Sequence, residues 1–375
     1  MSLQLSDEQS LLQQSVARFL ERGYSFDARR KLVQSELGFS KDNWAQFAEL
    51  GWLAVSLPED VGGLGGGPLE NMVVCEGFGR SLVLEPFIST AVLAARAVAL
   101  ADNAELRGEM LERIAGGQLL VSLAFAEAGS RYDLHHVETR ASAAGNGYAL
   151  SGGKIAVLDA PSADKLIVAA RLSGGVRDEA GVGLFVVDRN ASGLSLEHYP
   201  MMDGSRGANL ALNDTPAVML VGAERGLEVL ESAVQWAIAA RSAQAVGSMD
   251  ASYGQTLEYV KTREQFGQPI GRFQVIQHRM VDMYMRVTEA QTMVQRVARH
   301  LDEEDAAARR IAVSGAKAFI GRRARAVGQE IVQLHGGVGM TEELAIGHYF
   351  RALTLYCSLF GSTEYHLNRY AAMTQ

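Results

Sequence analysis

Cysteine is scarce in this chain of 375 residues, which holds only Cys75 and Cys357. Two cysteines cannot form a disulfide framework, so we expect a reducing compartment and a cytoplasmic location. The eight histidines are scattered, apart from the neighbours His135 and His136. No HxxxH or CxxC spacing occurs, so the sequence predicts no metal site, and the histidine pair is better interpreted as structural.

Long apolar runs and strong positive charge are also lacking. No stretch of about 18 uninterrupted apolar residues occurs, and the start MSLQLSDEQS lacks the basic flank and apolar run of a secretory signal. The net charge of −8 and the pI near 5.6 argue against a nucleic-acid binder, which needs clustered cations. We interpret the basic cluster GRRARA, residues 321–326, as a solvated helix face or a phosphate contact. We therefore expect no membrane span and no nucleic-acid partner.

What is present suits a large folded chain. Hydrophobic residues make up 48% of the sequence, which is ample for burial, and the length predicts two or three domains. We expect a mainly α fold with a central β domain. The expected parts are an N-terminal helical domain at 1–117, a middle β-barrel or sandwich at 118–222, and a C-terminal four-helix bundle at 223–375.

Local patterns predict this order of elements. Ser6 and Gln9 fit a capping box, Gly51 suits the end of a helix, and Pro68 suits the first turn of another. Residues 86–100 are apolar nearly all round, which predicts a buried helix. Short β-prone runs separated by Gly, Asn, Asp and Ser indicate a mostly antiparallel middle region. Long helical patterns cover about 228–262, 273–302, 304–333 and 342–357.

Three segments combine glycine with polar or aromatic residues. In KTREQFGQPIGRFQ, Arg263 can pair with a phosphate, Phe266 can stack on a flat ring and Gln274 can bond an amide or hydroxyl. The alternative is a helix connection whose phenylalanine fills the bundle. In VGQEIVQLHGGVG, the paired glycines let backbone N–H groups approach a ligand, or they end a helix. The third segment, LPEDVGGLGGGP, lacks the lysine of a phosphate loop, which favours a structural turn.

Taken together, the motifs resemble those of the acyl-CoA dehydrogenases. That family carries R-x-x-F-G-x-P-I-x-x-F-Q, then Q-x-x-G-G-x-G, then a late E-G-T-S turn, and this chain reads REQFGQPIGRFQ, QLHGGVG and FGST in the same order. The resemblance extends over the whole chain, including LGWLAVSLPEDVGGLG and DGSRGANLAL. The wording PEDVGGLGGGP and HGGVGM resembles more narrowly the small subunits of two-subunit members, such as pimeloyl-CoA dehydrogenases.

The resemblance implies FAD-linked α,β-dehydrogenation of an acyl-CoA substrate, with electron transfer flavoprotein as the electron acceptor. In such enzymes a glutamate removes the α proton while the β hydrogen leaves as hydride to FAD. Carried over position by position, the implied FAD contacts of this chain are Arg263, Phe266, Gln274, Gln333, Gly336, Gly337, Ser362 and Glu364.

The chain departs from the family at the base. The two positions at which members place the glutamate hold Phe360 and Ala237, neither of which accepts a proton. The nearest carboxylates in sequence are Glu364, beyond the turn, and Glu231 and Glu228, which do not share the helical face of Ala237. The sequence therefore predicts that this chain has no base of its own.

A second departure concerns the segments that cover the flavin ring. The family's T-E-P-x-A-G-S-D and W-I-T-N become AEAGSRYD at 126–133 and AVLD at 156–159. Ala156 replaces the aromatic residue, and Ala126 and Leu158 replace hydroxyl residues. Each buried partner left unpaired costs about 1–3 kcal/mol of flavin contact. By contrast, the motifs that reach the flavin of a neighbouring subunit in the family are intact.

This pattern predicts a base-lacking small subunit that works with a homologous larger subunit, as a heterotetramer. Two alternatives stay open. The chain can be a self-sufficient, homotetrameric acyl-CoA dehydrogenase with a non-standard base, or a non-catalytic scaffold of the same fold.

Overall fold

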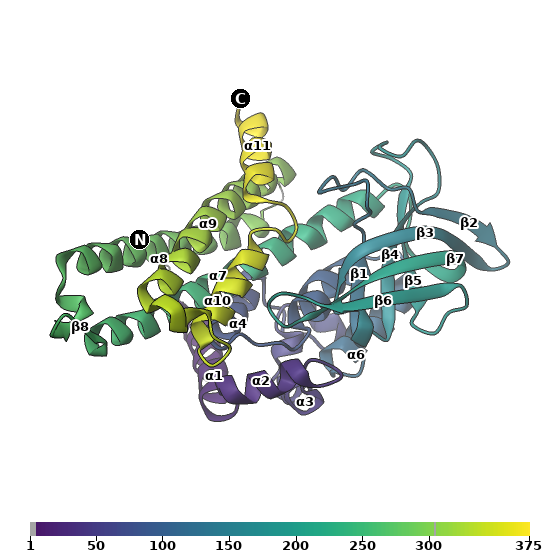
Figure 1. The fold of residues 1–375 in the computed structure, drawn as a ribbon. Helices are drawn as coiled ribbons and strands as arrows, with labels where there is room; N and C mark the ends of the chain where they lie inside the picture. The colour runs from purple at the N-terminus through teal and green to yellow at the C-terminus, as the bar shows by residue number, and fades with distance from the viewer. Residues whose placement is uncertain (1–4, 304) are drawn as a thin grey trace. The chain divides into compact units, whose positions relative to one another are not determined.

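The computed structural model describes residues 5–303 and 305–375 (Figure 1). The first four residues and the predicted helix start at 304 lie outside this part. The helices are α1 (Asp7–Gly23), α2 (Phe26–Gln34), α3 (Lys41–Glu49), α4 (Pro68–Ser81), α5 (Ala95–Ala99), α6 (Ala104–Ala115), α7 (Gly226–Thr262), α8 (Gln274–Leu301), α9 (Ala306–His335), α10 (Ala345–Tyr356) and α11 (Thr363–Thr374). The strands are β1 (Val121–Ala124), β2 (Arg140–Ala144), β3 (Gly147–Leu158), β4 (Lys165–Arg171), β5 (Val182–Asp188), β6 (Leu194–Pro200), β7 (Arg206–Val221), β8 (Glu264–Gln265) and β9 (Gln268–Pro269).

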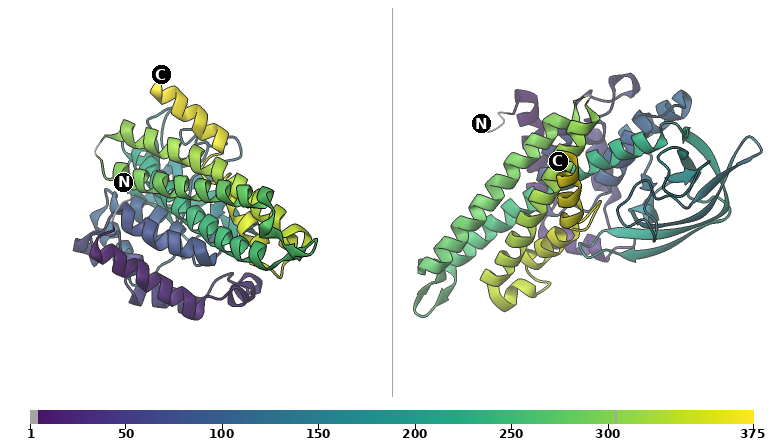
Figure 2. Two further views of the ribbon diagram at one scale, coloured as in Figure 1. Left: turned by 90° about the vertical axis from the view of Figure 1, so that its left-hand side faces the viewer. Right: turned by 90° about the horizontal axis from the view of Figure 1, so that it is seen from above.

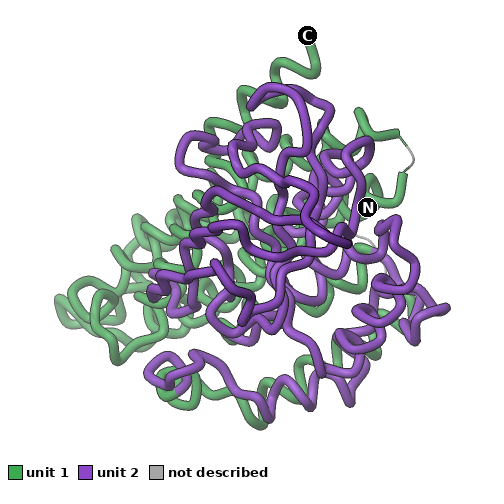
Figure 3. Tube along the Cα trace, turned by 90° about the vertical axis from the view of Figure 1, so that its right-hand side faces the viewer, with its two compact units in different colours: residues 1–31, 68–83, 238–375 green, residues 32–67, 84–237 purple. Residues whose placement is uncertain are grey.

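The chain divides into two compact units (Figure 3). One falls within residues 1–31, 68–83 and 238–375 and is helical, and the other covers 32–67 and 84–237 and contains the large sheet. The expected fold, mainly α with a central β domain, is confirmed. No helix among the described residues is long and apolar enough to cross a bilayer.

In the helical unit, α8 and α9 form a long pair that the views of Figure 2 show side by side. Every third or fourth residue of α8 is buried, which makes one apolar stripe along the helix. Two ion pairs tie α8 to α9: the Arg279 Nε lies 2.7 Å from Glu330 Oε2, and the Arg323 Nε lies 3.0 Å from Glu289 Oε2. The stripe and the ion pairs fix how the two helices face each other.

Helices α4 and α7 approach closely because two glycines stand at their contact. A Cβ built on Gly79 of α4 would lie 1.9 Å from the Gln244 carbonyl oxygen, and one built on Gly247 of α7 would lie 1.9 Å from the Glu76 carbonyl oxygen. The Ser248 hydroxyl also donates to the Gly79 carbonyl oxygen at 2.9 Å. Only glycine fits at either position, so these residues determine the distance between the two backbones.

The sheet of the second unit closes on itself. Strands β4, β2, β3, β7 and β5 are hydrogen-bonded in this order, and β5 pairs with β4 again. Strand β1 is parallel to β4, and β6 is antiparallel to β7. Strands β4 and β5 are buried along nearly their whole length, around a core that includes Leu150, Phe185 and Val187. The mostly antiparallel β region is therefore confirmed as a small barrel-like sheet.

Three local predictions are confirmed, and one needs a correction. Ser6 and Gln9 form the capping box of α1, Gly51 follows α3 with a φ of 75°, and α4 begins at Pro68. The predicted helix over 86–100 is buried, but its first part is a π-helix, Ile88–Ala94, followed by α5. The wider turns of π-helices are frequently found at functional sites.

The glycine-rich loop before α4 is a structural turn. The backbone N–H groups of residues 63–66 donate to the carbonyl oxygens of Pro58, Ala54, Leu57 and Val55. A phosphate loop needs such N–H groups free to face a ligand. In this loop the N–H groups of residues 63–66 donate to carbonyl oxygens within residues 54–58. The glycine cluster is therefore a structural turn and not a phosphate loop.

Candidate functional site

An exposed aromatic residue stands at the tip of the hairpin β8–β9. Phe266 has a φ of 54° and Gly267 a φ of 78°, which makes a two-residue turn of type I′. The left-handed region is strained for a bulky side chain, and Phe266 is nonetheless 93% exposed, with its ring edge-on to Phe273 at 6.1 Å. The exposure of Phe266 therefore excludes the interpretation that its side chain fills the helix bundle.

Two of the predicted segments meet through an aromatic contact. The rings of Tyr259 and His335 are stacked, with centroids 4.2 Å apart and planes at 23°. Tyr259 lies one turn before Arg263, and His335 directly precedes Gly336, so the stack brings the arginine segment and the paired glycines together. Sequence reasoning missed both residues. The sequence signal that could have indicated them is an aromatic ring close to each motif, Tyr259 before Arg263 and His335 before Gly336.

The end of α9 leaves room above its glycines. Gly336 has a φ of 64° and ends the helix, donating its N–H to the carbonyl oxygens of Gln333 and Val332. A Cβ built on Gly336 or Gly337 would meet no atom within 4 Å. The helix-end role is confirmed, and the space in front of these glycines stays open to a ligand. Arg263, Gln274 and Gln333 are exposed around the same motifs.

The late turn, where the family's glutamate is replaced, has a fixed backbone. Phe360 has a φ of 56°, and its carbonyl oxygen lies 2.9 Å from the Nε2 of His366. Gly361 follows with a φ of 124°, and a Cβ there would lie 2.3 Å from the same Nε2. The Ser362 hydroxyl accepts from the Tyr365 N–H at 3.1 Å and caps α11, while Glu364 is exposed in the first turn of that helix.

A buried lysine holds the segment that leads into this turn. Lys317 of α9 is 1% exposed, donates to the Tyr356 carbonyl oxygen and lies 3.6 Å from the centroid of the Tyr356 ring. The Tyr356 hydroxyl is 2.9 Å from the Ser242 hydroxyl of α7. Burial lowers the pKa of Lys317 to about 7. The turn is thus fastened by Lys317 before it and by His366 after it.

The buried histidine predicts acid sensitivity. Burial lowers the pKa of His366 from 6.5 to about 4, so the unfolded chain binds more protons between these values. Stability is then full above pH 6.5 and falls as the pH drops towards 4, by up to about 3 kcal/mol for this residue. Urea unfolding of His366→Gln, whose amide can donate to Phe360 but does not titrate, is expected to show a flatter pH dependence. Equal slopes for variant and parent would contradict this assignment.

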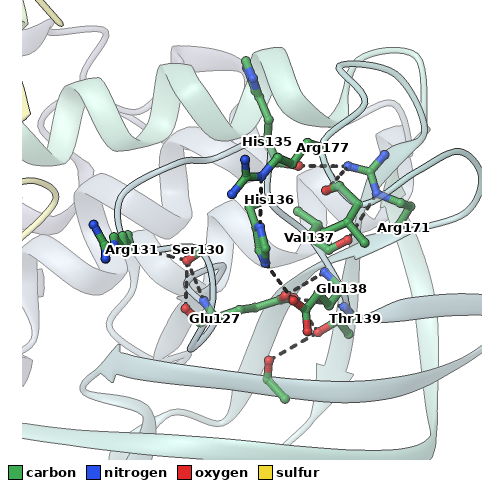
Figure 4. Close-up of polar contacts among 12 residues, drawn as sticks. Glu127, Ser130, Arg131, His135, His136, Val137, Glu138, Thr139, Arg171 and Arg177 are labelled. Atoms are coloured by element: carbon green, nitrogen blue, oxygen red, sulfur yellow. Dashed lines mark hydrogen bonds and ion pairs between the residues drawn. The ribbon is translucent and has the colours of Figure 1, made fainter.

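A second polar cluster lies in the sheet-containing unit (Figure 4). Glu127 forms a buried ion pair with Lys154 at 2.6 Å. The same carboxylate accepts from the Thr139 hydroxyl at 2.7 Å and from the backbone N–H groups of Glu138 and Thr139. Burial would raise the pKa of Glu127, but the ammonium and these donors outweigh it and hold the pKa below its usual value.

Three side chains of this cluster have the spacing of metal ligands. One ligand atom each of Glu127, His136 and Glu138 lies within 4.8 Å of the others, and this candidate cation site is empty. However, the Lys154 ammonium contacts Glu127, whose two oxygens also accept three hydrogen bonds from Glu138 and Thr139. A cation would be repelled there, so we interpret the cluster as structural.

Arg171 fastens the loops beside this cluster, as Figure 4 shows in part. It is fully buried, and in the described part of the chain its hydrogen bonds end on backbone carbonyl oxygens. These belong to His135, Val137, Ser173, Val176, Asp178 and Ala180. One guanidinium thus connects the segment after residue 134 with the connection between β4 and β5.

The two segments expected to cover a flavin lie side by side. The Ile155 N–H donates to the Ala126 carbonyl oxygen at 2.8 Å. Ala156 has a φ of 51°, is exposed, and donates its N–H to the Asn209 side chain at 3.2 Å. Leu158 is buried. The structure thus brings the segments together, but these three positions offer neither a hydroxyl nor an aromatic ring. Ala237, the other glutamate position, is fully buried in α7.

Comparison with known proteins agrees with the fold. The family profiles described as acyl-CoA dehydrogenase N-terminal, middle and C-terminal domains match residues 6–118, 122–214 and 224–374. Mitochondrial isovaleryl-CoA dehydrogenase of Pongo abelii is 30% identical over 369 residues, which is 96% of this chain and 87% of the relative. The chain belongs to the acyl-CoA dehydrogenase family, a family of FAD-dependent oxidoreductases.

Two solved structures are similar over nearly the whole chain. A variant of the steroid ACAD Tcur3481-Tcur3483 has a TM-score of 0.89 and 28% identity, covering 98% of both chains. The ChsE4-ChsE5 complex from Mycobacterium tuberculosis has a TM-score of 0.89 and 25% identity, covering 100% of this chain and 99% of the other. Both names contain two components.

Proposed function

We propose that this chain is the base-lacking small subunit of a heteromeric acyl-CoA dehydrogenase, whose larger, homologous subunit carries the glutamate. The observation that carries the proposal is Phe360, which stands at the family's glutamate position in a turn held by His366 and Lys317. Proton abstraction next to a thioester needs a positioned carboxylate, and phenylalanine cannot provide one.

The residues expected to reach a flavin in a neighbouring subunit fit FAD. The residues expected to hold a flavin within this chain do not. Arg263, Phe266 and the open space at Gly336 and Gly337 are accessible to a ligand that approaches from another subunit. The set that would hold a flavin within this chain lacks its donors, at Ala126 and at the other two substituted positions. This asymmetry supports a subunit that helps to bind a flavin held mainly by its partner. The two-component names of the similar structures favour the same arrangement.

Each residue of the accessible set has a chemical role in this proposal. The planar guanidinium of Arg263 pairs with a diphosphate through two parallel hydrogen bonds. The ring of Phe266 stacks on a flat heterocycle, and the N–H groups near Gly336 approach phosphate oxygens without steric hindrance. Bound FAD would supply the hydride acceptor of the reaction. The α proton goes to the partner's glutamate.

Flavin counting tests the proposal directly. The chain is expressed alone and together with a homologous chain from the same genome that retains the glutamate, and native mass spectrometry counts FAD per subunit. We expect one FAD per heterodimer, and neither bound flavin nor oxidation of straight-chain acyl-CoA thioesters for the chain alone. An isolated chain that holds one FAD per copy and oxidises these thioesters would overturn the proposal.

The strained hairpin separates stability from function. Phe266→Asn produces an Asn-Gly turn, the favoured sequence for type I′, so we expect the free energy of unfolding to rise by about 0.5–1 kcal/mol. FAD retention by the heteromer should fall at least about tenfold, because base-aromatic stacking contributes about 1–3 kcal/mol. Urea unfolding and flavin absorbance after gel filtration measure the two effects. Phe266→Leu keeps the strain and removes the ring, so it should lower flavin retention alone.

A further inference from the structure

A buried arginine near the N-terminus contacts a histidine near the C-terminus. Arg29 of α2 is 1% exposed, and its Nε donates to the Leu82 carbonyl oxygen at 2.7 Å. Its Nη1 lies 3.1 Å from the Nδ1 of His348, which is buried on α10. The ring of His348 also packs edge-on against Phe26, with the centroids 4.8 Å apart. The start of α10 is therefore held to α2 by a charged hydrogen bond inside the helical unit.

The contacts of His348 fix the position of its proton. Guanidinium nitrogens can only donate hydrogen bonds. The Nη2 of Arg351 lies 3.0 Å from the same Nδ1, so two arginines approach one ring nitrogen. That nitrogen must be the acceptor, and the proton of the neutral ring is on Nε2. The Nε2 lies 3.1 Å from an oxygen of Glu342, which is an attractive neighbour for an N–H group.

Glu342 belongs to the segment that carries the paired glycines. It stands between the 3₁₀ turn Gly336–Met340 and α10, and Arg351 donates to both of its oxygens, at 2.6 and 2.9 Å. The side chain of Glu342 is 64% exposed, and an exposed ion pair by itself contributes little to stability. This pair differs because the guanidinium of Arg351 is oriented by the buried His348.

The glycine turn also packs closely against α10. A Cβ built on Gly347 would lie 3.1 Å from the Gly339 carbonyl oxygen, so turn and helix approach each other beside His348. Residues 336–343 are exposed apart from Gly339. An exposed segment opens locally at low cost unless side chains hold it in place. A shift at the start of α10 would therefore move the paired glycines.

We infer that Arg29 and His348 are positioning residues for the glycine turn, because through Arg351 and Glu342 they hold residues 336–343 in the conformation that is open to FAD. Arg29 is too deeply buried to reach a ligand, so its effect passes through His348. The consequence for FAD rests on the proposed function, whereas the positioning of the turn does not.

Hydrogen exchange of the intact chain, read by mass spectrometry, tests the positioning without flavin. His348→Leu removes the acceptor for the arginines, so peptides that cover residues 336–343 should exchange at least about tenfold faster. His348→Gln restores an acceptor for the arginines and a donor for Glu342, and should stay within about twofold of the unmodified chain. Both variants lose the aromatic ring, so a role in packing alone would affect them alike.

A surface variant tests the same inference if His348→Leu does not fold. Glu342→Ala removes an exposed side chain and should raise exchange in the same peptides by a similar factor. In the double variant the two effects should not add, because both residues act on one segment. As a control, His366→Leu replaces another buried histidine of the helical unit and should leave exchange at 336–343 unchanged.

The contrary outcomes are specific. Unchanged exchange in His348→Leu, equal changes in the leucine and glutamine variants, or additive effects with Glu342→Ala would overturn the inference. FAD retention by the heteromer, read as flavin absorbance after gel filtration, should fall at least about tenfold for His348→Leu and stay normal for His348→Gln. Faster exchange with unchanged retention would overturn the link to FAD. If exchange changes as expected but no heteromer binds flavin, the proposed function fails and the positioning of the turn stands.

Discussion

Replacing Phe360 with glutamate is expected to give the chain an α-proton exchange activity that it lacks. The backbone of the turn is already fixed by His366, and the substitution adds the missing carboxylate. A positioned base contributes about 100-fold or more to proton transfer. The measurement is deuterium incorporation at the α carbon of straight-chain acyl-CoA thioesters in D₂O, read by mass spectrometry, for the isolated chain.

Two comparisons make this result interpretable. Phe360→Gln has the size of the glutamate variant but no comparable proton affinity, so it should show no exchange above the unmodified chain. If the unmodified chain exchanges α protons as fast as Phe360→Glu, a base is already present elsewhere. That outcome would favour the self-sufficient enzyme with a non-standard base over the base-lacking subunit.

The second large effect concerns the contact between α4 and α7. Gly79→Ala should lower the free energy of unfolding by about 3 kcal/mol or more, because the new methyl group would overlap the Gln244 carbonyl oxygen and force two backbones apart. Urea unfolding at neutral pH measures the change.

A matched substitution on α7 is expected to have the opposite sign. A Cβ on Gly254 meets no atom within 4 Å, so Gly254→Ala should raise stability by up to about 1 kcal/mol through helix propensity. If Gly79→Ala and Gly254→Ala changed the free energy of unfolding equally, the inference that the backbones of α4 and α7 are in close contact at Gly79 would be contradicted.

Much of the fold was predictable because its signals are local. The capping box at Ser6, the start of α4 at Pro68 and the end of α3 before Gly51 depend on neighbouring residues only. The π-helix Ile88–Ala94 was not predictable, because a run that is apolar all round contains no periodicity to separate π from α winding.

The candidate site was predictable from motifs but not in its geometry. Sequence alone left Phe266 between a buried and an exposed position, since side-chain burial depends on distant segments. The stack of Tyr259 on His335 joins residues 76 positions apart, and no local pattern indicates it. Arg171 was equally hidden, because backbone carbonyl oxygens have no sequence signature.

The two polar anchors of this chain should respond to their surroundings in different ways. Arg171 keeps its charge at every accessible pH and is solvated by peptide oxygens, so neither acid nor added electrolyte removes its partners. His366 becomes protonated in acid, and the charged ring is then unfavourable in its buried position beside Ser314. Acidification should therefore loosen the late turn of the bundle first, while the loops at the end of β4 keep their resistance to proteases.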